Sequence, residues 1–164
     1  MNEKTENTEF SPRALQAKAF FEQGYNCAQS VVLAFAEETG FDQKTAAKVA
    51  SSFGGGMGRL REVCGAVSGM FLALGAYCGT DDPADVEGKK AQYQDIQELA
   101  AKYREENGSI ICRELLGLTE KTSTPTPEKR TNEYYKKRPC GELVACAAQL
   151  LDDYIAKKKS VGTR

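Results

Sequence analysis

The most informative part of the sequence is residues 53–79, FGGGMGRLREVCGAVSGMFLALGAYCG. Four of the five positions from Gly54 to Gly58 are glycine. Glycines this dense cost backbone entropy, so they indicate positive φ angles or a backbone pressed against a neighbouring segment. Cys64 follows this loop where an apolar helical stretch begins, and helix N-termini favour the thiolate form of cysteine. We therefore expect Cys64 to be the centre of redox or metal chemistry.

The residues after Cys64 predict the central helix of the fold. Apolar side chains recur there at three- and four-residue steps, at Val67, Met70, Phe71, Leu74, Tyr77 and Cys78. Three glycines lie within the same stretch, and each weakens a helix by about 1 kcal/mol relative to alanine. We expect them where another backbone approaches closely. A turn at 80–83 is expected to open the next helix, which runs to Asn107.

The composition predicts one all-α domain, a single compact bundle of about five or six helices around the glycine-rich one. The 164 residues are 41% hydrophobic and 27% charged, as in an ordinary soluble globule. No stretch alternates in the manner of a β-strand. We expect a polar, disordered N-terminus at residues 1–10, one helical domain at 11–158 and a flexible tail at 159–164.

The charge balance argues against nucleic acid and membranes as partners. The chain has 22 basic and 23 acidic residues, a net charge of −1. Its apolar runs are too short to span a bilayer, and its polar start lacks the apolar core of a signal peptide. We therefore expect a cytoplasmic protein. The sequence identifies neither its redox partner nor its oligomeric state.

Cysteine is the residue type that carries the functional signal. Six cysteines are unusual in a reducing compartment, and the absence of histidine excludes Cys–His catalysis, mixed Cys/His zinc sites and haem ligation by histidine. Four cysteines each fall near the start of a predicted helix, and the four helices are different: Cys27, Cys64, Cys112 and Cys140. Their separations match no local metal-ligand spacing. We interpret the other two, Cys78 and Cys146, as small buried hydrophobes.

The same four cysteines carry a resemblance to a known family. Cys27, the CGAVSG run of residues 64–69, Cys112 in ICRELLGL and Cys140 in RPCGELV resemble the C_GCAxxG_C_C family, which is described as redox-active. The resemblance extends from about Tyr25 to Tyr154. One departure is that the family name places glycine before the cysteine, whereas Val63 precedes Cys64 here. The resemblance implies a redox role for the four cysteines and names no substrate.

Three functions remain open at this stage. In the first, two of the four cysteines cycle between dithiol and disulfide, with Cys64 as the attacking thiolate and with Arg59 and Arg61 lowering its pKa. In the second, the four thiolates bind zinc or an iron–sulfur cluster. In the third, a non-catalytic helical binding module uses its cysteines only for packing. Haem is not expected, because the chain has neither CxxCH nor histidine.

The glycine loop is a second candidate site. Gly54, Gly55 and Gly56 are candidate cofactor-binding residues, because glycine-rich loops cradle phosphates. The loop lacks GK[ST] and follows a predicted helix rather than a strand. We therefore favour a structural interpretation, in which the glycines permit close helix packing beside Cys64.

Overall fold

The computed structural model describes residues 9–162, and this part of the chain is all-α, without a β-strand. The predicted fold class is confirmed. Of the expected terminal segments, residues 1–8 and 163–164 lie outside the described residues. The first helix is α1 (Pro12–Glu22), whose N-cap is Ser11, with proline in the first turn.

The predicted central helix is α6 (Gly65–Cys78), and it packs between α2 (Cys27–Ala34) and α10 (Cys140–Ser160). Two of its glycines, Gly65 and Gly69, face α2, whereas Gly75 faces Gln92 of α7. A Cβ atom on Gly69 would lie 2.7 Å from the carbonyl oxygen of Ala28, and one on Gly65 would lie 3.1 Å from the Cβ of Cys27. The expected close approach of another backbone is confirmed.

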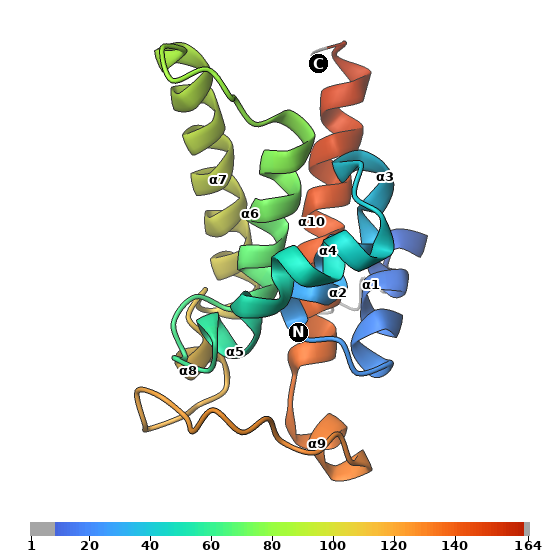
Figure 1. Cartoon of the computed structure of the whole chain (residues 1–164), viewed down its shortest axis with the longest axis vertical. Helices are drawn as coiled ribbons and strands as arrows, with labels where there is room; N and C mark the ends of the chain where they lie inside the picture. The colour runs from blue at the N-terminus through green and yellow to red at the C-terminus, as the bar shows by residue number, and fades with distance from the viewer. Residues whose placement is uncertain (1–8, 163–164) are drawn as a thin grey trace, which may run out of the picture.

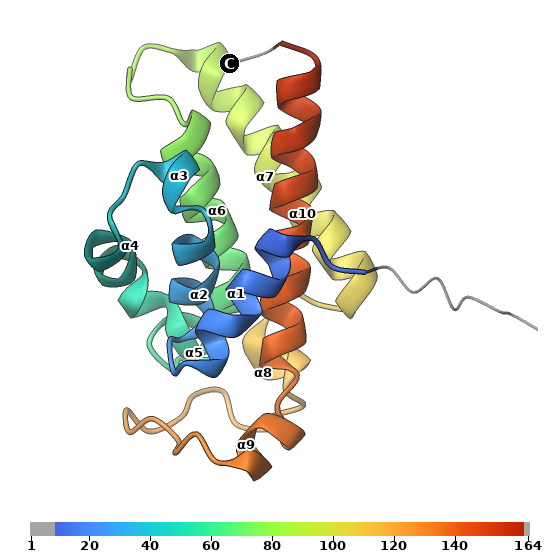
Figure 2. The same ribbon diagram turned by 90° about the vertical axis from the view of Figure 1, so that its right-hand side faces the viewer.

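The other elements surround this centre (Figures 1 and 2). They are α3 (Ala36–Thr39), α4 (Gln43–Ala50), a 3-10 turn (Ser51–Phe53), α5 (Gly54–Met57), α7 (Val86–Asn107), α8 (Cys112–Leu115) and α9 (Asn132–Lys137). Helix α1 packs along α10, and α7 packs against both α6 and α10. The long helix begins later than expected, at Val86, because Asp85 rather than the turn at 80–83 accepts the capping hydrogen bond from Gly88.

The starts of the cysteine-bearing helices gather at one end of the bundle. Cys27, Cys112 and Cys140 are the first residues of α2, α8 and α10, and Cys64 is the N-cap of α6. In Figures 1 and 2, α5, α8 and the start of α10 lie at the lower end of the molecule. The segment after α8, with α9, passes beneath them. This segment covers the space that the four cysteines line.

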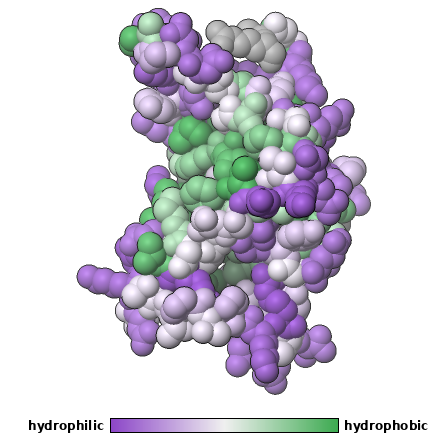
Figure 3. Space-filling view, in the orientation of Figure 1, coloured by the Kyte–Doolittle hydropathy of each residue, from purple (hydrophilic) through white to green (hydrophobic). Residues whose placement is uncertain are grey.

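On the face shown in Figure 3, hydrophobic residues gather across the middle of the molecule and hydrophilic residues cover the lower end. Helix α6 contributes Val67, Met70 and Leu74 to the buried core. Within residues 9–162 the structure contains no helix that combines the length and the apolar character needed to cross a membrane.

Candidate functional site

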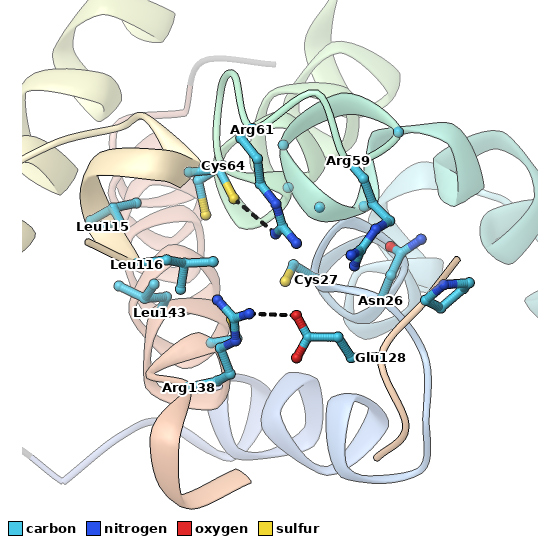
Figure 4. Close-up of a pocket in the computed structure, with 18 of the residues that line it drawn as sticks. Asn26, Cys27, Arg59, Arg61, Cys64, Leu115, Leu116, Glu128, Arg138 and Leu143 are labelled. Atoms are coloured by element: carbon cyan, nitrogen blue, oxygen red, sulfur yellow. Dashed lines mark hydrogen bonds and ion pairs between the residues drawn. The ribbon is translucent and has the colours of Figure 1, made fainter. Parts of the chain in front are cut away.

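All four predicted cysteines line a single cavity of about 320 Å³ (Figure 4). Cys27, Cys64, Cys112 and Cys140 come from four different elements, and all four are thiols rather than disulfides. The glycines at 54–56 line the same cavity. The chain therefore brings together the thiols that the helix starts indicated. Their chemical roles, and a cofactor-binding role for the glycines, stay predictions.

Cys27 is placed by the cap of α2. The Asn26 side chain accepts a hydrogen bond from the backbone N–H of Gln29 at 2.9 Å, and the Gln29 side chain accepts one from the backbone N–H of Asn26 at 3.0 Å. This capping box fixes the first turn of the helix. Asn26 also donates to the Ser51 carbonyl at 3.0 Å. A Cβ atom on Gly54 would lie 2.5 Å from the Asn26 side chain, so glycine is required there.

Cys64 and Cys112 are held side by side by two short antiparallel segments. Val63 forms an isolated bridge with Ile111. The backbone N–H of Cys64 donates to the carbonyl of Ile110 at 2.8 Å, and that of Cys112 donates to the carbonyl of Glu62 at 2.6 Å. Because side chains alternate along extended backbone, both thiols point away from the bridging pair on the same face.

The glycine loop has a left-handed backbone. Every residue from Gly55 to Arg59 has a φ between 62° and 70°, and Arg61 has a φ of 59°. For the residues other than glycine, this conformation costs about 1 kcal/mol or more each. The expectation of positive φ angles is confirmed. A Cβ atom on Gly56 would lie 2.5 Å from the Cβ of Cys112, so this glycine also lets the loop touch the thiol-bearing segment.

The loop directs Arg61 into the cavity, where its side chain contacts Cys112 rather than Cys64. Arg61 is only 5% exposed. One terminal nitrogen of its guanidinium lies 3.6 Å from the Cys112 sulfur, and Nε donates to the Ser123 hydroxyl at 2.9 Å. Arg59 donates to the Thr124 carbonyl at 2.6 Å. Among the described residues, neither arginine is hydrogen-bonded to Cys64, and their expected effect on the pKa of that thiol stays a prediction.

The expectation that Cys64 is the low-pKa thiolate was wrong. Burial raises the pKa of the Cys64 thiol to about 11. Hydrogen bonds from the Tyr103 phenol, 3.6 Å from the sulfur, and from the backbone N–H groups of Ala66 and Val67 lower this pKa, as a helix start should. Loss of hydration outweighs them, because Cys64 is only 5% exposed. No sequence pattern marks the hydroxyl of Tyr103.

The thiol whose pKa is lowered is Cys140. A hydrogen bond between Cys27 and Cys140 lowers the pKa of Cys140 and raises that of Cys27, and burial opposes ionisation of both. The charges of Arg138, Arg130 and Arg61 lower the pKa of Cys140 further. The two thiols therefore titrate as a pair in which Cys140 is the member that ionises more readily.

Two further arginines of the cavity were not predicted. Arg130 donates to the carbonyls of Phe21 and Tyr25, both at 3.1 Å, and its guanidinium lies 4.3 Å from the centre of the Phe21 ring. Arg138 forms an ion pair with Glu128 at 2.5 Å, a contact visible in Figure 4. Arg138 lies two residues before Cys140 in the sequence, and this spacing could have indicated that its charge is near that thiol. Arg130 lies in a polar, proline-containing loop that gave none.

The other two cysteines lie outside the cavity lining. Cys146 is buried, and its sulfur lies 3.1 Å from a Glu106 carboxylate oxygen and 3.3 Å from the Asn107 amide nitrogen. Burial raises the pKa of its thiol to about 12. Cys78 is partly buried and packs against the core at the end of α6. The structure therefore separates these two cysteines from the four at the site.

The metal-binding alternative has no preformed ligand set in residues 9–162. In that range, no group of three or more cysteine, aspartate or glutamate side chains is arranged to hold a metal ion. A four-thiolate centre would require the sulfurs to move from the positions that they occupy in this structure.

Comparison with known proteins gives one match. A family model described as "Putative redox-active protein (C_GCAxxG_C_C)" matches residues 25–154, a range that contains all four cysteines of the cavity. No curated protein and no solved structure matches the chain.

Proposed function

The chain belongs to the C_GCAxxG_C_C family, and on that premise we propose that Cys27 and Cys140 are its redox centre and act by thiol–disulfide exchange. The observation that supports this proposal is that Cys27 and Cys140 line one cavity together with four arginines, and that interaction with Cys27 lowers the pKa of Cys140. A thiolate is the nucleophile in such exchange, and Cys140 is the member of the pair whose pKa is lowered.

The reaction proceeds in two displacements. The Cys140 thiolate attacks one sulfur of a substrate disulfide, forming a mixed disulfide and releasing the first substrate thiolate. Cys27 then loses its proton and attacks the Cys140 sulfur, which releases the second substrate thiolate. The protein dithiol is oxidised to a disulfide, and the substrate disulfide is reduced to two thiols once the released thiolates take up protons.

Cys64 and Cys112 have a secondary place in this proposal. Cys64 keeps its proton at neutral pH because its pKa is about 11, so it is not the attacking group. Its neighbour Cys112 lies on the paired segment and contacts Arg61. These two cysteines, which line the same cavity, form a second candidate pair.

A redox titration tests the proposal. Anaerobic protein is equilibrated in buffers of reduced and oxidised dithiothreitol, remaining thiols are alkylated, and disulfides are mapped by peptide mass spectrometry. We expect one reversible disulfide between Cys27 and Cys140. Cys140→Ser and Cys27→Ser each abolish it, whereas Cys78→Ser, outside the cavity lining, is the matched control that retains it.

Two results would overturn the proposal. One is the absence of any reversible disulfide at Cys27 and Cys140 over the whole titration. The other is stoichiometric zinc or iron in the anaerobically purified protein, detected by elemental analysis and lost in the Cys140→Ser variant. That outcome would favour the metal-binding alternative.

A further inference from the structure

The cavity that holds the thiol pair has an excess of positive charge. Its lining contains four arginines and one carboxylate, namely Arg59, Arg61, Arg130, Arg138 and Glu128. Glu128 is already paired with Arg138. Even when one thiolate is counted as well, two positive charges are left uncompensated. A ligand that carries two negative charges would balance the cavity.

Arg61 is the arginine of this cavity whose charge most needs a negatively charged partner. Its guanidinium is always protonated, and a buried cation costs several kcal/mol unless it is paired. The side chain is 5% exposed, and its hydrogen-bond partners are the neutral Ser123 hydroxyl and the Cys112 sulfur. Among residues 9–162, no carboxylate oxygen lies within 4.0 Å of it. Figure 4 shows this side chain extending toward the centre of the cavity near Cys27.

The dimensions of the cavity restrict the substrate to a small molecule. Cys140 is only 8% exposed, so a disulfide must enter the cavity to reach it. The volume of about 320 Å³ is at the lower end of the range for small-molecule sites. Exposed residues of the loop, including Pro125 and Pro127, line the cavity on its outer side. The cavity volume and the burial of Cys140 therefore favour a small disulfide over one within a folded protein.

We propose that the substrate is a small disulfide with carboxylate end groups, which bind to the cavity arginines while the disulfide bond lies at Cys140. Arginine is suited to this role because its fork of N–H donors binds a carboxylate through two parallel hydrogen bonds. Arg61 and Arg59, which follow the glycine loop, hold one carboxylate. Arg130, from the loop on the other side of the cavity, holds the second. The inference rests on the proposed thiol–disulfide exchange and specifies its substrate class.

The first test measures binding without redox chemistry. Suberate has the chain length of 3,3′-dithiodipropionate but contains no sulfur, and 1,8-octanediol is its uncharged counterpart. Calorimetry with the reduced protein should show that suberate binds at least about tenfold more tightly than the diol. Arg61→Gln should weaken suberate binding by about 10- to 100-fold. Lys102→Gln, an exposed lysine outside the cavity lining, removes the same charge and should leave binding unchanged.

The second test measures reduction of three disulfides that differ only in their end groups. These are 3,3′-dithiodipropionate with two carboxylates, bis(2-hydroxyethyl) disulfide without charge, and cystamine with two amines. Rates for the reduced protein are divided by those for dithiothreitol, which corrects for intrinsic reactivity. The dicarboxylate should react about tenfold faster than the neutral disulfide, and cystamine should be slowest. High salt should reduce these differences if arginine charges cause them.

The two tests fail in different ways. Equal binding of suberate and the diol, or no binding of either, overturns the inference even if Cys27 and Cys140 cycle as proposed. Suberate binding without reduction of any disulfide overturns the proposed exchange and leaves an anion site. The suberate and diol comparison uses the unaltered protein, so it decides the question even if Arg61→Gln does not fold.

Discussion

Replacement of Gly69 by alanine tests how closely α2 must approach α6 to build the site. The added Cβ atom would lie 2.7 Å from the carbonyl oxygen and 3.0 Å from the Cα atom of Ala28. Both are backbone atoms, so relief requires α2 to move as a unit. Overpacking of this kind costs about 1–3 kcal/mol. The higher helix propensity of alanine offsets about 1 kcal/mol of this cost. The net loss in free energy of unfolding should therefore lie between about 0 and 2 kcal/mol.

Gly75→Ala is the matched control in the same helix. Its Cβ atom would meet only the amide nitrogen of Gln92, at 3.5 Å, which is an ordinary contact. The helix-propensity gain should therefore remain, and this variant should be more stable than the parent by about 0.5–1 kcal/mol. Urea unfolding of the reduced proteins measures both changes. At about 2–4 °C per kcal/mol for a chain of this size, thermal melting separates the two variants as well.

The same substitution should affect the thiols. Ala28 follows Cys27 directly, so movement of α2 weakens the hydrogen bond that lowers the pKa of Cys140. The alkylation rate of Cys140 at neutral pH should fall in Gly69→Ala and stay unchanged in Gly75→Ala. Equal stability of the two variants would refute the argument that the glycines are present for close packing.

Three further predictions concern individual side chains. Because the pKa of Cys140 is lowered from 9.0, its rate of iodoacetamide alkylation should level off below pH 9, whereas that of Cys64 should keep rising toward its pKa of about 11. Peptide mass spectrometry across neutral and alkaline pH distinguishes the two sites. Tyr103→Phe should cost about 1 kcal/mol in urea unfolding and slow Cys64 alkylation, since the phenol lowers that pKa. Cys146→Ala should lower stability by about 1 kcal/mol and leave disulfide formation in the redox titration unchanged.

Local sequence signals were sufficient to place the cysteines along the chain. Asn26 with Gln29 three residues later is a capping pair, and it fixes the start of α2 at Cys27. The glycines of the central helix indicated the close approach of another backbone, which is that of α2. These inferences succeeded because capping and steric contact of glycine depend on few residues. The end of the long helix at Asn107 followed for the same reason, since Gly108 adopts a left-handed conformation there.

The ionisation of the thiols could not be derived in this way. A helix start lowers a cysteine pKa only while water can still stabilise the charge, and Cys64 is too deeply buried. Cys140 is favoured by arginines that reach it from a loop and from the turn before α10. Which charge faces which sulfur depends on the path of residues 118–139 across the end of the bundle. That path has no periodic sequence signal.

The two members of the thiol pair lie more than a hundred residues apart in the chain, near opposite ends of the helical domain. A covalent link between them would close a loop that runs from the start of α2 to the start of α10 and contains the central helix α6. In the chain-entropy description, such a link stabilises the native state by about 4–5 kcal/mol, a large fraction of the total stability of a domain. Oxidation would then stabilise the folded state of the domain against global unfolding. The melting temperature, and with it resistance to proteolysis, would report the redox state of the protein.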